Sequence, residues 1–178
     1  TSEEKFAKAF QSNPDFIMIS RLSDGRIVEV NRGFEALTGY AASEAVGRTT
    51  TDLDLWADQA DREEMIRRLY ADGVVHGLET VLVARDGKPR QVLVSATLLD
   101  INGEVHIIGT SRDITELKRA HESLRRSEER FAKAFNANPN YATVSRLEDG
   151  RFVAVNKGFE RMTGWKAQEV LGRTAHEI

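Results

Sequence analysis

An internal repeat constrains this chain more than any other feature of its sequence. Residues 4–53 reappear as residues 129–178, and about half of the positions are identical when the two stretches are aligned without a gap. The period of about 125 residues is the size of a domain and too long for one unit of a solenoid. We therefore predict one complete module, a connecting helix and the beginning of a second module. The expected parts are an N-terminal helix over 1–12, a first domain over 13–113, a linker helix over 114–135 and a truncated second domain over 136–178.

The stretch that connects the two copies has the pattern of a charged helix. Asp113 and Glu116 have the spacing of a capping box, in which two side chains bond to free backbone N–H groups of the first turn. Apolar residues then recur at alternating three- and four-residue steps, with His121 and Glu128 as polar members of this coiled-coil seam. We expect the helix to begin at Asp113 and to pair with a second copy, with help from the flanking modules. The alternative is a single amphipathic helix that lies on its own domain.

Composition limits the classes of function. The 178 residues carry a formal net charge of -3, and basic residues alternate with acidic ones, which argues against nucleic acid as a partner. The chain has no cysteine, so disulfides, thiolate metal sites and cysteine nucleophiles are excluded. No apolar run is long enough to span a bilayer, and no signal-peptide pattern stands at the N-terminus. We expect a cytoplasmic fragment of a longer protein, with no membrane partner.

The first module has the pattern of an antiparallel α+β fold. Hairpin signals are Ser23-Asp24-Gly25, Asp86-Gly87 and Asn102-Gly103. They connect strands that we expect over 16–20, 27–31, 75–85, 89–100 and 104–112. Helices are expected over 32–38, 42–46 and 59–71, and a glycine follows each of them closely. This order predicts an antiparallel sheet with helices on one face, followed by a long linker helix.

These landmarks, in this order, resemble the PAS family of sensor domains. The resemblance covers the whole first module, and its opening part recurs in the second copy around Asn156 and Gly164. One departure is Ala41, with Lys166 in the copy, where the family commonly has a Ser or Thr cap. The residues that carry the resemblance are Asn13-Pro14, the Asp-Gly hairpin, Val30-Asn31-Arg32-Gly33-Phe34, Leu37-Thr38-Gly39-Tyr40, Glu44-Ala45-Val46-Gly47-Arg48, Asp86-Gly87 and Gly109-Thr110-Ser111-Arg112-Asp113-Ile114-Thr115.

The resemblance implies a fold and a role. The fold is a five-stranded antiparallel sheet cupped by helices, with PAC-type closing strands, and it often holds a small ligand. The role is that of an input or dimerisation unit of histidine kinases, cyclic-dinucleotide enzymes or chemoreceptors, in which Asp113, Ile114 and Thr115 pass a change in the sheet to the following helix. We therefore expect a sensory module of a multidomain signalling protein. It is not itself expected to be an enzyme.

Partners follow from the same resemblance. We expect a homodimer through the N-terminal and linker helices, and a downstream output domain in the same chain. One alternative is a ligand-free PAS dimerisation scaffold. Another is a phosphorelay fragment that uses His121, because His121-Glu122 resembles the phosphoacceptor box of histidine kinases. That box continues with a proline, whereas Arg126 to Glu129 continues a helix, so a histidine in the helix seam is the competing interpretation.

The expected ligand pocket is apolar and lies between the strands and the helices. Thr49, Thr50, Thr51, Ser95 and Thr97 are the nearby hydroxyls that could orient a polar ligand. The alternative is that the same side chains fill a solid core, as protein interiors normally do. The candidate pocket residues are Ile19, Val30, Phe34, Leu37, Leu55, Trp56, Ile66, Leu69, Leu82, Val94 and Ile107.

The residues require no cofactor. Photochemical flavin PAS domains and those with a thioester chromophore need a cysteine, which this chain lacks. Haem PAS domains use a histidine of the long helix, and residues 59–71 contain none; His76 and His106 belong to strands and are expected to face solvent. Non-covalent flavin or another small molecule remains open, with Trp56 either as a stacking partner or as a core residue. The sequence contains no catalytic constellation and no metal-ligand cluster.

The second copy presents a stability problem. It has one hairpin and two helical turns but lacks the three later strands, and a domain this small seldom buries enough apolar surface. We expect residues 141–178 to be poorly ordered or completed by contacts with another chain.

Overall fold

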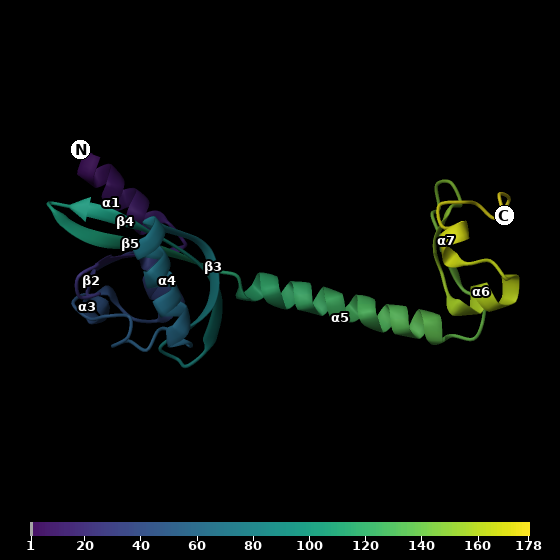
Figure 1. Ribbon diagram of the computed structural model, residues 1–178, viewed down its shortest axis with the longest axis horizontal. Helices are drawn as coiled ribbons and strands as arrows, with labels where there is room; N and C mark the ends of the chain where they lie inside the picture. Colours follow the sequence, from purple (N-terminus) through teal and green to yellow (C-terminus); the bar gives the residue numbers. More distant parts are fainter. Residues whose placement is uncertain (1) are drawn as a thin grey trace. The chain divides into compact units, whose positions relative to one another are not determined.

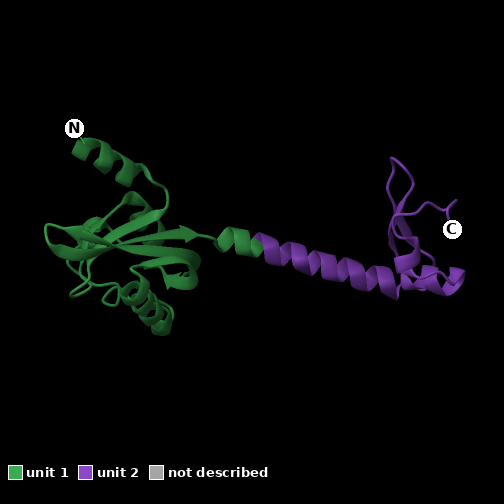
Figure 2. Cartoon of the chain, turned by 45° about the horizontal axis from the view of Figure 1, so that its top comes forward, with its two compact units in different colours: residues 1–119 green, residues 120–178 purple. Residues whose placement is uncertain are grey.

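The computed structural model describes residues 2–178, and the chain divides into two compact units at residues 119 and 120 (Figures 1 and 2). In the first unit, five strands form one antiparallel sheet in the order β2-β1-β5-β4-β3. The predicted α+β fold with a five-stranded antiparallel sheet and a long following helix is confirmed. The strands are β1 (Phe16–Arg21), β2 (Ile27–Val30), β3 (Val74–Val83), β4 (Pro89–Ile101) and β5 (Glu104–Asp113). The helices of the same region are α1 (Ser2–Ser12), α2 (Arg32–Thr38), α3 (Ala42–Ala45), α4 (Gln59–Asp72) and α5 (Thr115–Ala137).

The β4–β5 hairpin shows how a local signal fixes the register. Asn102 and Gly103 both have positive φ angles, 54° and 82°, as a two-residue turn that matches the strand twist requires. Ile101 therefore pairs with Glu104, and the ladder continues without a shift to Val92 opposite Asp113. The register places the last residues of β5 beside the first half of β4.

The sheet is covered on both faces. Side chains alternate along β1, so Phe16 and Met18 face α4, whereas Ile17 and Ile19 face the other way. Phe10 of α1 packs with Ile17 and Ile19 on that second face. Helices α2, α3 and α4 cover the first face as predicted, and α1 adds a cover on the opposite face.

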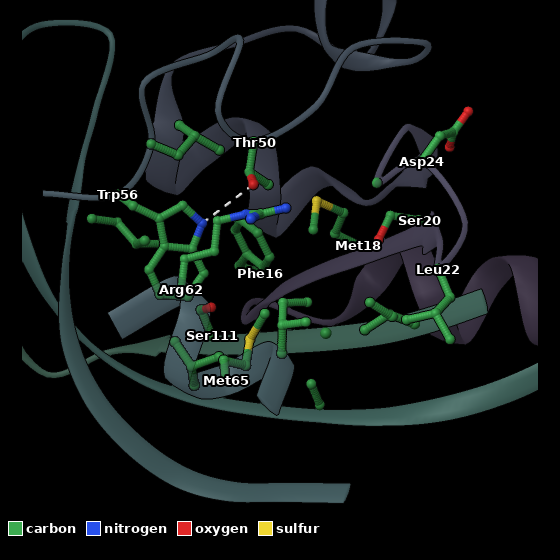
Figure 3. Close-up of a pocket in the computed structure, with 18 of the residues that line it drawn as sticks. Phe16, Met18, Ser20, Leu22, Asp24, Thr50, Trp56, Arg62, Met65 and Ser111 are labelled. Carbon is green, nitrogen blue, oxygen red and sulfur yellow. Dashed lines mark hydrogen bonds between the residues drawn. The ribbon is translucent and has the colours of Figure 1, made fainter. Parts of the chain in front are cut away.

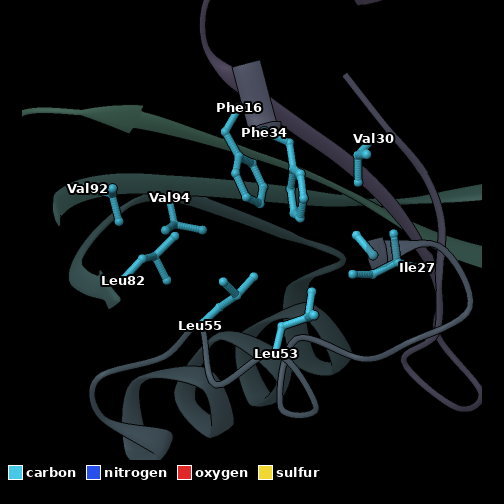
Figure 4. Packing of buried hydrophobic residues seen from close by; sticks show 10 residues of the cluster. Phe16, Ile27, Val30, Phe34, Leu53, Leu55, Leu82, Val92 and Val94 are labelled. Carbon is cyan, nitrogen blue, oxygen red and sulfur yellow. The ribbon is translucent and has the colours of Figure 1, made fainter. Parts of the chain in front are cut away.

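The main core of this unit lies between the sheet and α2 (Figure 4). The rings of Phe16 and Phe34 stand 5.0 Å apart at its centre, tilted by 44°. Leu82 and Val94 approach from β3 and β4, and Leu55 from the loop before α4. A second cluster joins Leu69 of α4 to Val75, Ala96 and Ile107 of the strands. The two clusters fix α4 over the sheet.

Asn31 is buried between α1, β1 and α2, and both ends of its amide are used. Its Oδ1 accepts hydrogen bonds from the N–H groups of Ile17 (2.8 Å) and Phe34 (2.9 Å), the second of which caps α2. With the three hydrogen bonds that its Nδ2 donates, the side chain makes five in all. Its Nδ2 donates to the carbonyl oxygens of Phe10 (3.1 Å), Asn13 (3.2 Å) and Asp15 (2.9 Å).

The residue after Arg32 must be glycine for a steric reason. A Cβ at Gly33 would lie 2.1 Å from the carbonyl oxygen of Asp15, which is backbone and cannot move aside. The second copy repeats the arrangement, with Gly158 equally close to the carbonyl oxygen of Asn140. Asn156 also repeats all five hydrogen bonds of Asn31. The sequence repeat is therefore a repeat of structure at this point.

The start of α3 is stabilised without the Ser or Thr that Ala41 replaces. The Glu44 carboxylate accepts from the N–H of Ala41 (3.0 Å), and the Glu35 carboxylate of α2 accepts from the N–H of Ala42 (2.7 Å). Hydrogen bonding to the Ala41 N–H lowers the pKa of Glu44, so the contact favours the ionised form of this cap. A carboxylate from the preceding helix thus accepts from a free N–H group at the start of α3, in place of a side-chain cap.

The second unit contains β6 (Thr143–Ser145), β7 (Phe152–Val155), α6 (Lys157–Thr163) and α7 (Ala167–Val170). Its small apolar cluster consists of Phe152, Val155, Phe159 and Val170. Tyr141 is 44% exposed, whereas its counterpart Phe16 is 5% exposed, because within residues 2–178 β6 pairs only with β7 and no strand corresponds to β5. The expected disorder or completion by another chain stays a prediction.

None of the described helices combines the length and the apolar character that a bilayer crossing needs.

We predict that Asn31→Ala lowers the free energy of unfolding of the first unit by about 3 kcal/mol or more, because it leaves buried backbone groups without partners. Urea unfolding followed by the indole N–H NMR signal of Trp56 measures this loss. The matched control is Asn13→Ala, which removes one exposed hydrogen bond to the N–H of Asp15 and should cost about 1 kcal/mol. Equal losses in the two variants would contradict the role of Asn31.

Candidate functional site

A cavity of about 270 Å³ lies between the sheet and α4 (Figure 3). This volume is just below the range of about 300–1,000 Å³ that is usual for ligand pockets. Most of the walls are apolar, and β1, β3, β4 and β5 contribute to them. Its lining includes Phe16, Met18, Ser20, Asp24, Gly25, Thr50, Leu55, Trp56, Arg62, Met65, Ile66, Leu82, Val94, Ala96, Ile107 and Ser111.

The structure brings only part of the predicted pocket residues to this cavity. Ile19 lies on the opposite face of the sheet, where it packs with Phe10. Val30 and Phe34 are buried in the main core, Leu37 packs against that core, and Leu69 belongs to the second cluster. The predicted residues that do line the cavity are Leu55, Trp56, Ile66, Leu82, Val94 and Ile107.

Five of the lining residues that the prediction missed follow two simple periodicities. Phe16, Met18 and Ser20 alternate with Ile19 along β1 and therefore face the other side of the sheet. Arg62 and Met65 precede Ile66 on the same stripe of α4, at helical spacing. The alternation along β1 and the helical spacing along α4 could therefore have predicted these five residues from the sequence.

Of the predicted hydroxyls, Thr50 lines the cavity and accepts a hydrogen bond from Nε1 of Trp56 at 3.2 Å (Figure 3). Ser95 and Thr97 lie on the opposite face of the sheet, in a shallow depression with Ile108 and Thr110, because they alternate with Val94 and Ala96. Trp56 is half-buried with its ring on the main core and its N–H on Thr50. It thus serves both as a packing residue and as a wall of the cavity.

Asp24 carries the acidic charge of the cavity lining, and basic groups surround it. The N–H of Arg26 donates to its carboxylate at 3.0 Å, and the Arg21 guanidinium lies 2.6 Å away. The hydrogen bond from the Arg26 N–H, followed by the contacts with Arg21, lowers the pKa of Asp24. Asp24 is therefore an ionised carboxylate whose negative charge is already paired with Arg21 and hydrogen-bonded to the N–H of Arg26.

The junction between β5 and α5 is tied to β4. The N–H of Ile114 donates to the carbonyl oxygen of Gln91 (2.8 Å), and the N–H of Gln91 donates to the hydroxyl of Thr115 (2.9 Å). The Asp113 carboxylate accepts from the N–H of Thr115 at 2.8 Å. Asp113 itself is the last residue of β5, and α5 begins at Thr115, one residue later than the expected linker helix over 114–135.

Two ion pairs flank this junction. Nζ of Lys118, in the first turn of α5, lies 2.6 Å from the Glu79 carboxylate of β3. Nη2 of Arg112 lies 2.9 Å from the Asp15 carboxylate before β1, and this hydrogen bond raises the pKa of Arg112. The first turn of α5 therefore contacts β3 and β4, and the end of β5 contacts the start of β1.

The described part of α5 presents a stripe of large exposed apolar residues. Leu117, Leu124 and Phe131 are 69%, 59% and 58% exposed, and they are three of the predicted seam positions. Between them, hydrogen bonds from Arg125 and then Arg126 lower the pKa of Glu122 to about 2. The helix thus combines paired charges with apolar side chains that nothing in the described chain covers.

The histidines divide into exposed and buried ones. His76 and His121 are exposed, the second on α5. His106 was expected to face solvent but is buried, and its Nδ1 lies 2.9 Å from the carbonyl oxygen of Glu104. Within residues 2–178, the His, Asp and Glu side chains form no group of three that could hold a metal ion.

Comparison with known proteins agrees with this architecture. A family model described as PAS domain matches residues 14–116, more than half of the chain, and a second PAS domain model matches residues 129–178. The search of curated proteins found no match.

Three solved structures illustrate the likeness. The PAS domain of a protein from Colwellia psychrerythraea is 26% identical with a TM-score of 0.57, over 65% of this chain and 99% of that one. The PAS domain of an HTR-like protein from Haloarcula marismortui is 30% identical with a TM-score of 0.53, over 64% of this chain and 92% of that one. The PAS domain of nitrogen regulation protein NR(II) from Vibrio parahaemolyticus, 16% identical, shares the fold with a TM-score of 0.51 over 61% and 96% of the two chains. With a family model over most of the first unit and a second over the repeat, this chain belongs to the PAS domain family.

Proposed function

We propose that the first unit is a sensory module in which occupancy of the cavity changes the state of α5. The sensory domain of this proposal is residues 13–113, as the sequence predicted, and Asp113, Ile114 and Thr115 are its relay. One observation carries the proposal: the strand that walls the cavity also holds the first turn of α5. Val94 of β4 lines the cavity, and Gln91, three residues earlier on the same strand, bonds to Ile114 and Thr115.

The position of β4 in the sheet supports this coupling. β4 is hydrogen-bonded to β3 on one side and β5 on the other, so it cannot move without moving the strands that carry the ends of the junction. Glu79 of β3 holds Lys118 of α5, and β5 runs directly into the helix. A ligand that pushes against Val94 or Leu82 would act on both attachments at once.

The exposed stripe of α5 supports pairing with a second copy of the chain. Leu117, Leu124 and Phe131 recur at seam spacing, and a coiled-coil seam buries such residues against a partner helix. Phe6 of α1, which is stacked on Phe10 at 5.8 Å, is a second exposed aromatic residue for the same interface. The proposal therefore includes a homodimer through α1 and α5, a cytoplasmic location and an output domain further along the same chain.

We predict that Thr115→Val weakens the junction without unfolding the domain. It leaves the N–H of Gln91 without an acceptor, at a cost of about 1 kcal/mol, so protection of that amide against hydrogen exchange should fall about fivefold. The first turn of α5 should lose protection with it. Hydrogen exchange followed by NMR measures both changes.

The control for this experiment is Thr97→Val, on the face of β4 that points away from the cavity. The Thr97 hydroxyl makes one long hydrogen bond of 3.4 Å. Protection at Gln91 should stay as in the wild type. If Thr115→Val left the first turn of α5 as protected as before, the relay through Gln91 would be refuted.

We predict that Leu124→Asn weakens self-association of the chain at least tenfold, because it replaces a central apolar seam residue by a polar one. Sedimentation equilibrium measures the dimer dissociation constant. Lys133→Asn introduces the same residue on the side of α5 away from the seam and should leave the constant unchanged. A wild-type chain that stays monomeric at high concentration would rule out pairing through α5.

A further inference from the structure

Arg62 differs from the other arginines of α4 in having no carboxylate partner. Arg67 and Arg68 of the same helix both pair with Glu64. Arg62 is half-buried, lines the cavity and makes no ion pair or hydrogen bond with any residue in the described part of the chain. A half-buried charge without a partner costs free energy, and a ligand of opposite charge would recover it.

The guanidinium of Arg62 lies across the cavity from its own helix. A Cβ at Gly25, in the turn between β1 and β2, would stand 3.6 Å from Nη2 of Arg62, so the side chain spans from α4 to that turn. Figure 3 shows it reaching toward Thr50, whose hydroxyl oxygen already accepts from Trp56. The hydroxyl proton of Thr50 is thus free to be donated to a group held by Arg62.

Two further hydroxyls face the cavity from the sheet. Ser20 and Ser111 are only 5% and 3% exposed, both line the cavity, and neither hydroxyl has a hydrogen-bond partner within residues 2–178. No buried side-chain nitrogen or oxygen in the described chain lacks a partner, so these two hydroxyl oxygens are open to the cavity, where water or a ligand can bond to them. They give the cavity two polar groups, on β1 and β5, to which an occupant with polar atoms could bond.

The charge balance of the lining favours an anion. Asp24 is matched by Arg21 and by the N–H of Arg26, so its charge is not available to Arg62, with which it forms no ion pair. The net uncompensated charge at the cavity is the one positive charge of Arg62. Apart from the hydroxyl groups, the walls are mostly apolar, with Met18, Met65 and Ile107 among them.

We infer that the cavity binds a small organic anion, a carboxylate on an apolar body, with the carboxylate at Arg62 and Thr50 and the body between β4 and α4. A volume of about 270 Å³ suits a small ligand. Two methionines in the wall, Met18 and Met65, suit a flexible aliphatic chain. This inference rests on the sensory function proposed above and names the class of its ligand.

The test compares octanoate with 1-octanol, which has the same body without the charge. Isothermal titration calorimetry on the full chain should show octanoate binding about tenfold to a hundredfold more tightly than 1-octanol, because a hydrogen bond to a charged group adds this much. Arg62→Gln should abolish the preference. Its folding should be intact, because Arg62 has no partner within the described chain, and the urea midpoint checks this.

The matched control is Arg67→Gln, which removes the same charge from the exposed side of α4 and should keep the preference for octanoate. Equal binding of both probes, no binding of octanoate, or an unchanged preference in Arg62→Gln would each overturn the inference. Hydrogen exchange of α5 separates this result from the proposed function. Octanoate that binds without altering α5 would contradict the relay alone, and octanol that binds equally and alters α5 would contradict the anion class alone.

Discussion

One buried amide determines the geometry on which the rest of the first unit depends. Asn31 joins the end of α1, the start of β1 and the first turn of α2 through five hydrogen bonds to backbone groups. Backbone partners have fixed positions, so the amide sets where β1 begins and which of its side chains face α4. The positions of Phe16 and Met18, and so one wall of the cavity, follow from it. Asn156 preserves the same pattern in the repeat, where most of the sheet is absent from the described chain.

Much of the fold could be predicted because its signals are local. Asn102-Gly103 and Asp86-Gly87 set the hairpins, and the glycines after the helices have the positive φ angles that end them. The pocket could be predicted only in part, because β1 has apolar residues in both phases. Ile19 and Met18 are equally apolar candidates for the pocket, because α1 covers the face of β1 that points away from the cavity. An alternating pattern of apolar and polar residues tells the two faces of a strand apart only when one of them meets water.

Tertiary contacts account for the other differences. Asp113 has the residue type and spacing of a helix cap, but its pairing with Val92 keeps it in β5, and Gln91 takes the N–H of Ile114. The helix therefore starts at Thr115. Similarly, Ala41 lacks a cap in sequence, yet Glu35 supplies one from α2. Arg62 was overlooked because an arginine on a helix is usually solvated, and only the structure shows that it lines a cavity without a partner.

The strength of the junction suits a switch. A ligand can shift α5 by no more than the difference between its affinities for the two states, and such couplings are typically about 1–3 kcal/mol. The bonds of Gln91 to Ile114 and Thr115 are worth about 1 kcal/mol each, so losing them costs an amount that a small ligand can supply. A junction buried in the main core with Phe34 would cost far more to break. For the proposed relay, these bonds at the start of α5 are therefore of a strength that ligand binding in the cavity beside β4 could overcome.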